Sequence, residues 1–229
     1  MGKAGITAAP ASPEGDAGAA PDLALAASGK PPKETSRDRM LKAATSEFCA
    51  RGYFDVSVED IASASGVSRM TFYRHFSGKA EIASELFRLN SQAAMPRLMM
   101  IANFDFRNRA VVEQWITRLF DDDRDRRQLL RVFSQANADE AGFTQRAQRL
   151  IDELIVGLGQ VIPAFALDPE APADRRRWIE AWLVLYEVLD QGNHAARAAG
   201  LATDPLMPGI LADRFLRFVR DGDSRPWRR

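Results

Sequence analysis

Apolar residues recur every three to four positions along most of the chain after residue 36, as they do in helices that bury one face. No stretch alternates apolar and polar residues in the manner of a half-buried strand. The spacing therefore predicts an all-α protein. The longest stripes comprise Val112, Trp115, Ile116, Leu119 and Phe120, then Leu129, Val132, Phe133 and Ala136, then Ala147, Leu150, Ile151, Leu154, Leu158 and Val161.

Three short helices are predicted between residues 36 and 76. A serine stands at each expected start, at Ser36, Ser57 and Ser68, where a hydroxyl oxygen can accept a free backbone N–H. Glycine follows the first two helices, at Gly52 and Gly66, and permits the left-handed or tight turns that end them. The spacing predicts a compact three-helix unit.

The third helix, over residues 69–76, carries Phe72 and Phe76 at i and i+4, so both rings are expected to point into the core. Between residues 61 and 80 the chain has three cations and no carboxylate. A short helix that presents hydroxyl and guanidinium groups suits the major groove of DNA. The residues expected to face outward, wholly or partly, are Arg69, Met70, Thr71, Tyr73, Arg74 and His75.

Lys79 is expected in the first turn of a fourth helix, with Ser77 as its N-cap. A cation there opposes the helix dipole, and a bound anion such as a DNA phosphate would remove the conflict. The alternative interpretation is a solvated lysine that tolerates a small penalty.

Residues 37–90 resemble the DNA-binding domain of TetR-type transcriptional regulators. The resemblance covers about a quarter of the chain and depends on several anchors at fixed offsets. These are Met40-Leu41-Lys42-Ala43-Ala44, Phe48, Gly52-Tyr53, Val58-Glu59-Asp60-Ile61-Ala62, Gly66-Val67-Ser68 and Thr71-Phe72-Tyr73-Arg74-His75-Phe76 with Lys79.

The resemblance implies a division of labour at double-stranded DNA. Glu59 stands where some family members have a base-reading arginine, which would confine base reading to the third helix. Tyr73 could instead be a core aromatic, and His75 a helix-stabilising partner of a neighbour. The implied phosphate contacts are Ser57, Tyr73, His75 and Lys79, the implied base contacts are Arg69, Met70 and Thr71, and Ser68 and Arg74 complete the predicted interface.

The helix predicted over residues 175–199 is apolar almost all round: nine of eleven residues from Ile179 to Leu189 are apolar. Such a helix must be covered on more than one side. A second copy of the chain could cover the remaining face. This helix and the last helix, from Ile210 to Arg220, would then form a four-helix interface with the same two helices of the second copy, as the resemblance also implies. We therefore expect a homodimer whose two recognition helices reach successive major grooves. A monomer with this helix fully enclosed is the alternative.

Aromatic residues in the C-terminal part could line a small-molecule pocket with a few polar anchors. An apolar or amphipathic ligand would then change the spacing of the two DNA-binding heads. An aromatic stripe that simply fills the core is the alternative. The residues predicted to bind the ligand are Trp115, Phe133, Trp182, Tyr186 and His194, with Phe120, Gln135, Asn137, Glu187 and Asp190 as further candidates.

Charge and motifs argue against an enzyme. The formal net charge is +0, which excludes a broadly polycationic protein but leaves local patches open. Gly66-Val67-Ser68 lacks the closing glycine of a nucleophile elbow, and two histidines with one cysteine form no metal cluster, so no cofactor is expected. The acidic run Asp121 to Asp123 is interpreted as part of a solvated helix start.

The predicted organisation has three parts: a disordered tail over residues 1–36, a helix-turn-helix domain over 37–84, and a larger helical ligand-binding and dimerisation domain over 85–229. Ala, Pro and Gly make up 20 of the first 36 residues, too little apolar bulk to order the tail. No apolar run is long enough for a membrane span, and the single Cys49 fits a cytoplasmic protein.

Two functions remain open. One is a homodimeric repressor that a small ligand releases from its operator. The other is a DNA-bound dimer without an effector, which recruits a protein partner. A cavity in the C-terminal domain would favour the first, and a filled core would favour the second.

Overall fold

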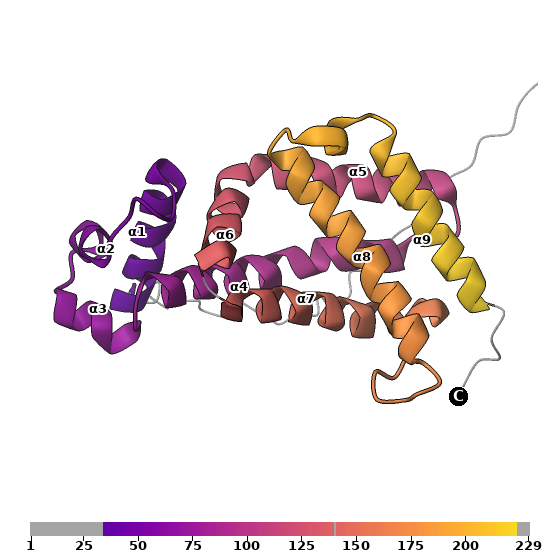
Figure 1. The fold of residues 1–229 in the computed structure, drawn as a ribbon, viewed down its shortest axis with the longest axis horizontal. Helices are drawn as coiled ribbons and strands as arrows, with labels where there is room; N and C mark the ends of the chain where they lie inside the picture. The colour runs from indigo at the N-terminus through magenta and orange to yellow at the C-terminus, as the bar shows by residue number, and fades with distance from the viewer. Residues whose placement is uncertain (1–33, 140, 224–229) are drawn as a thin grey trace, which may run out of the picture. The chain divides into compact units, whose positions relative to one another are not determined.

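The computed structural model describes residues 34–139 and 141–223, so the predicted tail lies outside the described residues up to position 33. The described part is helical and contains no strand, which confirms the all-α prediction (Figure 1). None of its helices is both long and apolar enough to cross a membrane. The helices are α1 Ser36–Arg51, α2 Val58–Ser65, α3 Arg69–His75, α4 Lys79–Leu98, α5 Arg109–Asp125, α6 Arg127–Asp139, α7 Ala141–Gly159, α8 Arg175–Ala196 and α9 Met207–Asp223, with 3-10 turns at Met99–Asn103, Pro163–Phe165 and Gly200–Thr203.

Side-chain caps fix the starts of the first three helices. The N-cap of α1 is Thr35, so the prediction of Ser36 is wrong by one residue. Thr35 and Asp38 cap each other reciprocally, because a threonine and an acidic residue three positions on form a capping box. The predicted caps of α2 and α3 are confirmed: the Ser57 hydroxyl accepts the Asp60 N–H, and the Ser68 hydroxyl accepts the Thr71 N–H.

The turn between α2 and α3 depends on Gly66, whose φ of 65° lies in the left-handed region that side chains with a Cβ adopt at a cost. This confirms the turn predicted there. With Ser68 capping α3 directly after it, the two helices form the expected helix-turn-helix.

One hydrophobic core joins α1 to α4 with one face of α6. Met40, Phe48, Tyr53, Phe72 and Phe76 are among its buried members. From α6, residues 132, 133 and 136 complete this core. The predicted domain boundary at residue 84 falls inside α4, which runs unbroken from Lys79 to Leu98 and contributes to the cores on both sides.

A second core lies among α5, α7, α8 and α9, and Figure 1 shows α8 and α9 side by side with α5. Trp115 and Phe165 both pack against Phe215, with ring centroids 5.6 and 5.8 Å apart. One face of α8 packs against other helices of the chain, and Trp178 and Leu185 are buried there. The opposite face of α8 is exposed.

Candidate functional site

Helix α3 presents one face outward because its other face is anchored in the core. Phe72 is fully buried and Phe76, the residue after the helix, is 2% exposed. On the outer face Met70 is 84% exposed, while Arg69 and Arg74 are also exposed. Thr71 and His75 are half-buried at the edges of this face. The outward orientation predicted for these side chains is therefore what the structure has.

Arg69 is held in place before any DNA is present. One guanidinium nitrogen lies 2.9 Å from a carboxylate oxygen of Glu59, on α2. The guanidinium also lies 5.6 Å from the centre of the Tyr73 ring, close enough for a cation–π contact. The Tyr73 side chain is exposed and its ring meets Phe72 edge-on, so it is not the core aromatic of the alternative interpretation. Glu59 and Tyr73 thus set the direction in which Arg69 points.

Arg74 stands on the same face without a partner, since it makes no hydrogen bond or ion pair with the described residues.

Ser57, at the start of α2, is exposed, but its hydroxyl already donates a hydrogen bond to the Asp60 carboxylate at 2.7 Å. The hydrogen bonds from Ser57 are the main reason that the pKa of Asp60 falls to about 2. A phosphate contact from Ser57 would have to compete with this cap.

Lys79 is bonded inside the protein. Its ammonium donates to the carbonyl oxygens of Tyr53, Phe54 and Val56 at 3.0, 3.2 and 3.1 Å, and lies 4.6 Å from the centre of the Tyr53 ring. An ammonium has three donors, and three carbonyls take them. The geometry favours a structural role, in which Lys79 fastens the loop between α1 and α2. Its predicted phosphate contact stays a prediction.

The start of α4 differs from the one predicted. Gly78 is the N-cap and makes no side-chain cap, so the assignment of Ser77 is wrong. The Ser77 N–H and hydroxyl both donate to the Glu81 carboxylate, at 2.6 and 2.7 Å. The reason is that Glu81 lies in the first turn of α4, where it can reach back to the residue before the N-cap.

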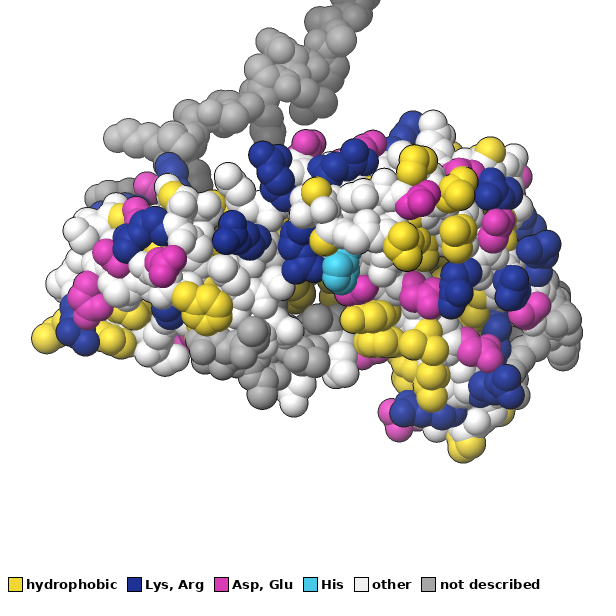
Figure 2. All heavy atoms as spheres, turned by 45° about the horizontal axis from the view of Figure 1, so that its top comes forward, with side chains coloured by type: hydrophobic (Ala, Val, Ile, Leu, Met, Phe, Trp, Pro, Cys, Tyr) yellow, Lys and Arg dark blue, Asp and Glu magenta, His cyan; other side chains and the backbone are white. Residues whose placement is uncertain are grey.

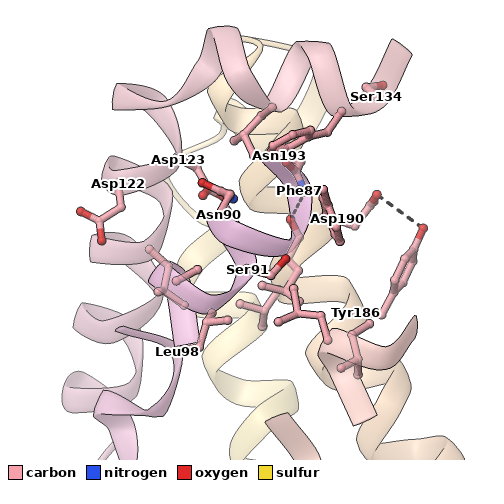
Figure 3. A pocket seen from close by; sticks show the side chains of 18 of the residues that line it. Phe87, Asn90, Ser91, Leu98, Asp122, Asp123, Ser134, Tyr186, Asp190 and Asn193 are labelled. Atoms are coloured by element: carbon pink, nitrogen blue, oxygen red, sulfur yellow. Dashed lines mark hydrogen bonds between the residues drawn. The ribbon is translucent and has the colours of Figure 1, made fainter. Parts of the chain in front are cut away.

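A cavity of about 350 Å³ opens between helices α4 to α8 (Figure 3). Apolar side chains from α4, α5 and α6 form much of its wall, and amides, hydroxyls and carboxylates interrupt it. Its volume is within the range of small-molecule sites. Its lining includes Phe87, Ser91, Leu119, Asp123, Phe133 and Asp190.

The predicted ligand residues divide into two groups. Phe133 and Tyr186 line the cavity, as do Asn137 and Asp190 among the further candidates. The other predicted residues lie elsewhere. Trp115 is a core residue, 6% exposed, whose indole N–H points to the Arg97 carbonyl.

Trp182 and His194 are also outside the lining. Trp182 stacks on Tyr186 with ring centroids 4.9 Å apart. The His194 ring nitrogen Nδ1 lies 2.8 Å from the Asp190 carbonyl oxygen one turn earlier in α8. Assigning Trp115, Trp182 and His194 to the cavity is thus not supported, because helical spacing does not distinguish the face of a helix that meets a cavity from one that meets a neighbour.

Helix α6 connects the cavity to the helix-turn-helix. Phe133 lines the cavity and belongs to the N-terminal core, and its ring meets Phe87 of α4 edge-on at 5.3 Å. Two residues along, the Gln135 side chain accepts the Tyr53 N–H at 2.8 Å. Gln135, predicted as a ligand anchor, is therefore a contact to the loop after α1. Displacement of α6 would move groups that hold the DNA-binding unit.

Asp123 is a charged cavity residue that the sequence interpretation missed. The run from Asp121 to Asp123 lies at the end of α5, so its assignment to a solvated helix start is wrong. Asp123 is half-buried, and burial is the main reason that the pKa of its carboxyl rises to about 6; the neighbouring charges of Arg126, Asp122 and Arg97 have smaller effects. The sequence contains a signal for this position, because Asp123 follows Leu119 at i+4 and so lies on the same helix face as the apolar stripe.

The raised pKa predicts a pH-dependent cost to folding. As the pH rises, an aspartate in the unfolded chain, with a pKa of 3.8, loses its proton at a lower pH than Asp123 does in the folded protein. The free-energy cost of keeping Asp123 in the folded protein is therefore absent below about pH 4 and complete above about pH 6. Asp123→Asn should therefore raise the free energy of unfolding at pH 7.5 by about 1–2 kcal/mol. Thermal unfolding from pH 7.5 down to 4.5 checks this, with Asp121→Asn as the control. A gain in stability that stays constant across this range would contradict the prediction.

The geometry defines a class: a helix-turn-helix protein whose α3 has an exposed outer face, joined through α4 to a helical bundle that contains a cavity. Residues 40–86 match the family model of the bacterial regulatory proteins of the tetR family. The N-terminal helix-turn-helix is thus similar to the DNA-binding domain of TetR-type transcriptional regulators.

Curated relatives match in the same region. The chain is 43% identical over 51 residues to the HTH-type transcriptional regulator YdgC of Bacillus subtilis, covering 22% of this chain and 26% of the relative. It is 44% identical over 48 residues to the regulator TcmR of Streptomyces glaucescens, covering 21% of each. The matched segment spans about a quarter of the length of these relatives, so the similarity describes the DNA-binding domain.

Solved structures extend the similarity to the fold of the larger domain. The regulator SCO7518 of Streptomyces coelicolor superposes with a TM-score of 0.60 at 18% identity, covering 80% of this chain and 98% of that one. SmeT, solved as a complex with triclosan, superposes with a TM-score of 0.51 at 22% identity, covering 81% and 90%. At these identities the likeness shows the shared fold.

Proposed function

We propose that the protein is a homodimeric repressor that binds a specific operator and is released by a small ligand. The observation that carries the proposal is the outer face of α3, where Arg69 is aimed by Glu59 and Tyr73 while Phe72 anchors the helix. A pre-positioned guanidinium can donate two hydrogen bonds to one guanine edge. Base reading therefore falls mainly on Arg69, with Met70 and Thr71 beside it.

The exposed face of α8 supports a dimer. Ile179, Leu183 and Tyr186 follow one another at i, i+4 and i+7 and are 46%, 49% and 43% exposed. Figure 2 shows hydrophobic side chains gathered over α8 and α9 among charged ones. A second copy of the same face would cover this stripe, and a two-fold axis would give two copies of α3 facing one duplex.

Coupling between ligand and DNA would pass through α4 and α6. A ligand in the cavity would touch Phe87 and Phe133, which also pack into the N-terminal core. The Gln135 bond to Tyr53 transmits a shift of α6 to the loop that precedes α2. A ligand acts in this way only if it binds the DNA-competent and DNA-incompetent arrangements with unequal affinity. Because the C-terminal domain has a cavity, the ligand-responsive function is favoured over recruitment of a protein partner.

Selection of bound fragments from genomic DNA, followed by footprinting on the recovered sites, tests the proposal. We expect a sequence with two-fold symmetry that the protein protects, and repression of a promoter containing it in transcription assays. Recovery of fragments without a shared sequence would contradict specific binding. Stimulation of transcription from the promoter would agree with specific DNA binding but would contradict the proposal that the protein is a repressor.

Arg74 gives a separate prediction, because it is the unpartnered cation on the outer face. Arg74→Gln should weaken binding to all sequences alike and reduce the slope of log affinity against log salt concentration by about one per subunit, as loss of a phosphate contact does. Titrations of operator and random duplex at several salt concentrations measure this. Arg88→Gln, which changes an exposed arginine paired with Glu85 on α4, is the matched control. A loss restricted to the operator would instead make Arg74 a base contact.

A further inference from the structure

The end of α5 brings an uncompensated carboxylate against the backbone of α8. A Cβ built on Gly192 would lie 2.7 Å from an Asp123 carboxylate oxygen and 3.4 Å from the Phe120 ring. The carboxylate is therefore in close contact with α8, and a side chain at position 192 would require the Asp123 side chain to move. Glycine inside a helix is itself destabilising compared with alanine. Two unfavourable local choices, an interior glycine and a half-buried acid, meet at the cavity.

The Asp123 carboxylate has no hydrogen bond or ion pair with the described residues, although other charges surround it. Arg97, on α4, forms its ion pair with Asp122, at 3.1 Å, and its charge has only a small effect on Asp123. Figure 3 shows Asp122 pointing away while Asp123 points toward Asn90 on α4. Arg126, just past the end of α5, is half-buried and influences Asp123 only through its field.

The charges on α8 are placed differently. Asp190 is the third carboxylate in the lining, after Asp122 and Asp123; the Tyr186 hydroxyl donates to it at 3.5 Å, and His194 lies beside it at 3.4 Å. Arg197 is exposed and donates to the Ser134 hydroxyl and the Asn193 carbonyl, at 3.0 and 3.2 Å. The cavity therefore has two carboxylates without a cationic partner of fixed charge, and one exposed arginine without an acid.

A second unsatisfied group belongs to the cavity wall. The Ser91 hydroxyl oxygen is buried and has no hydrogen-bond partner. It belongs to α4, one residue after Asn90, and lines the same cavity. The rest of the wall includes Leu119 and the facing pair Phe87 and Phe133. A fitting ligand is thus a small amphiphile with one polar, positively charged end.

We propose that the cavity binds an organic cation, with its charged nitrogen beside the Asp123 carboxylate and its apolar body against Phe87, Leu119 and Phe133. The inference rests on the proposed function in that it names the chemical class of the ligand. A cation at this position supplies the counter-charge that the folded chain does not provide. The raised pKa of Asp123 has the same origin, since burial without a partner favours the neutral form.

Isothermal titration with three probes of equal chain length tests the charge preference: octyltrimethylammonium, 1-octanol and octanoate. We expect octyltrimethylammonium to bind the full-length protein at least tenfold more tightly than the other two. Asp123→Asn should weaken its binding at least tenfold and leave 1-octanol binding within threefold. Asp121→Asn, two residues earlier and paired with Arg124, is the matched control and should change neither.

The pH dependence provides a second readout that loss of folding would not reproduce. The probe carries a fixed charge, so its affinity should fall as the pH drops below about 6, where Asp123 gains a proton. Asp123→Asn should abolish most of this dependence, which separates Asp123 from Asp190 and His194. Circular dichroism and thermal unfolding confirm that each variant is folded.

Three results would overturn the inference. Octanoate could bind as tightly as octyltrimethylammonium or more tightly, octanoate binding could be lost in Arg197→Gln, or octyltrimethylammonium binding could be unchanged in Asp123→Asn. The first two would assign the cavity to anions held by Arg197. Operator binding is measured separately on the same samples. Failure to bind DNA would reject the proposed function, whereas cation binding that leaves operator affinity unchanged would retain the ligand class and reject its role as effector.

Discussion

Leu183→Glu should convert the protein from dimer to monomer and lower operator affinity at least about 100-fold. Leu183 is 49% exposed in the middle of the α8 stripe, between Ile179 and Tyr186. In a symmetric interface the same residue from both copies lies near the axis, so the substitution buries two like charges. A monomer places only one α3 on the duplex and loses the gain from two linked contacts. Analytical ultracentrifugation and operator titration measure the two effects.

Val156→Glu is the matched control, because Val156 is 52% exposed on α7 and lies outside the α8 stripe. It should leave the mass and the operator affinity unchanged. A Leu183→Glu protein that remains dimeric and binds its operator normally would show that the subunits meet elsewhere.

Arg69→Ala should remove most of the discrimination between operator and random duplex. Each half-site would lose about 1–3 kcal/mol, the usual value of an arginine that reads a guanine. Affinity for random DNA should change far less, because the phosphate contact proposed for Arg74 would remain. Titration of the operator, of single-base variants and of a random duplex measures the ratio.

Glu59→Gln tests how far base reading by Arg69 depends on its being positioned by Glu59. It keeps the size of the side chain but weakens the 2.9 Å ion pair with Arg69 and removes a negative charge near the phosphates. We expect tighter binding to random DNA and a smaller ratio between operator and random duplex. If Arg69→Ala instead lowered affinity for every sequence by the same factor, Arg69 would be a phosphate contact.

The helix-turn-helix could be predicted because its signals are local. Ser57, Gly66 and Ser68 fix helix ends through their own backbone geometry, and Phe72 and Phe76 face inward from spacing alone. Pro96 shows the limit of such signals. A proline inside a helix usually kinks or ends it, yet α4 continues through Pro96 to Leu98.

Lys79 and the cavity could not be predicted for a different reason. The three carbonyls that bind Lys79 lie more than twenty residues earlier in the chain, and no helical period relates them. Likewise, the cavity depends on how five helices meet, so the stripe that contains Trp115 and the one that contains Phe133 look equivalent in sequence. Asp123 was treated as one of three surface acids although its register matched the buried face.

Hydroxyl-radical footprinting of the full-length protein on the operator recovered by genomic selection shows where the protein contacts the duplex. If the outer face of α3 reads DNA as one of a symmetric pair, two protected segments should appear on one side of the duplex, centred about one helical turn or a multiple of it apart. In Arg69→Ala, the protection of both segments should differ much less from the protection of a random duplex. A single protected segment, or no protection at low ionic strength, would contradict the account.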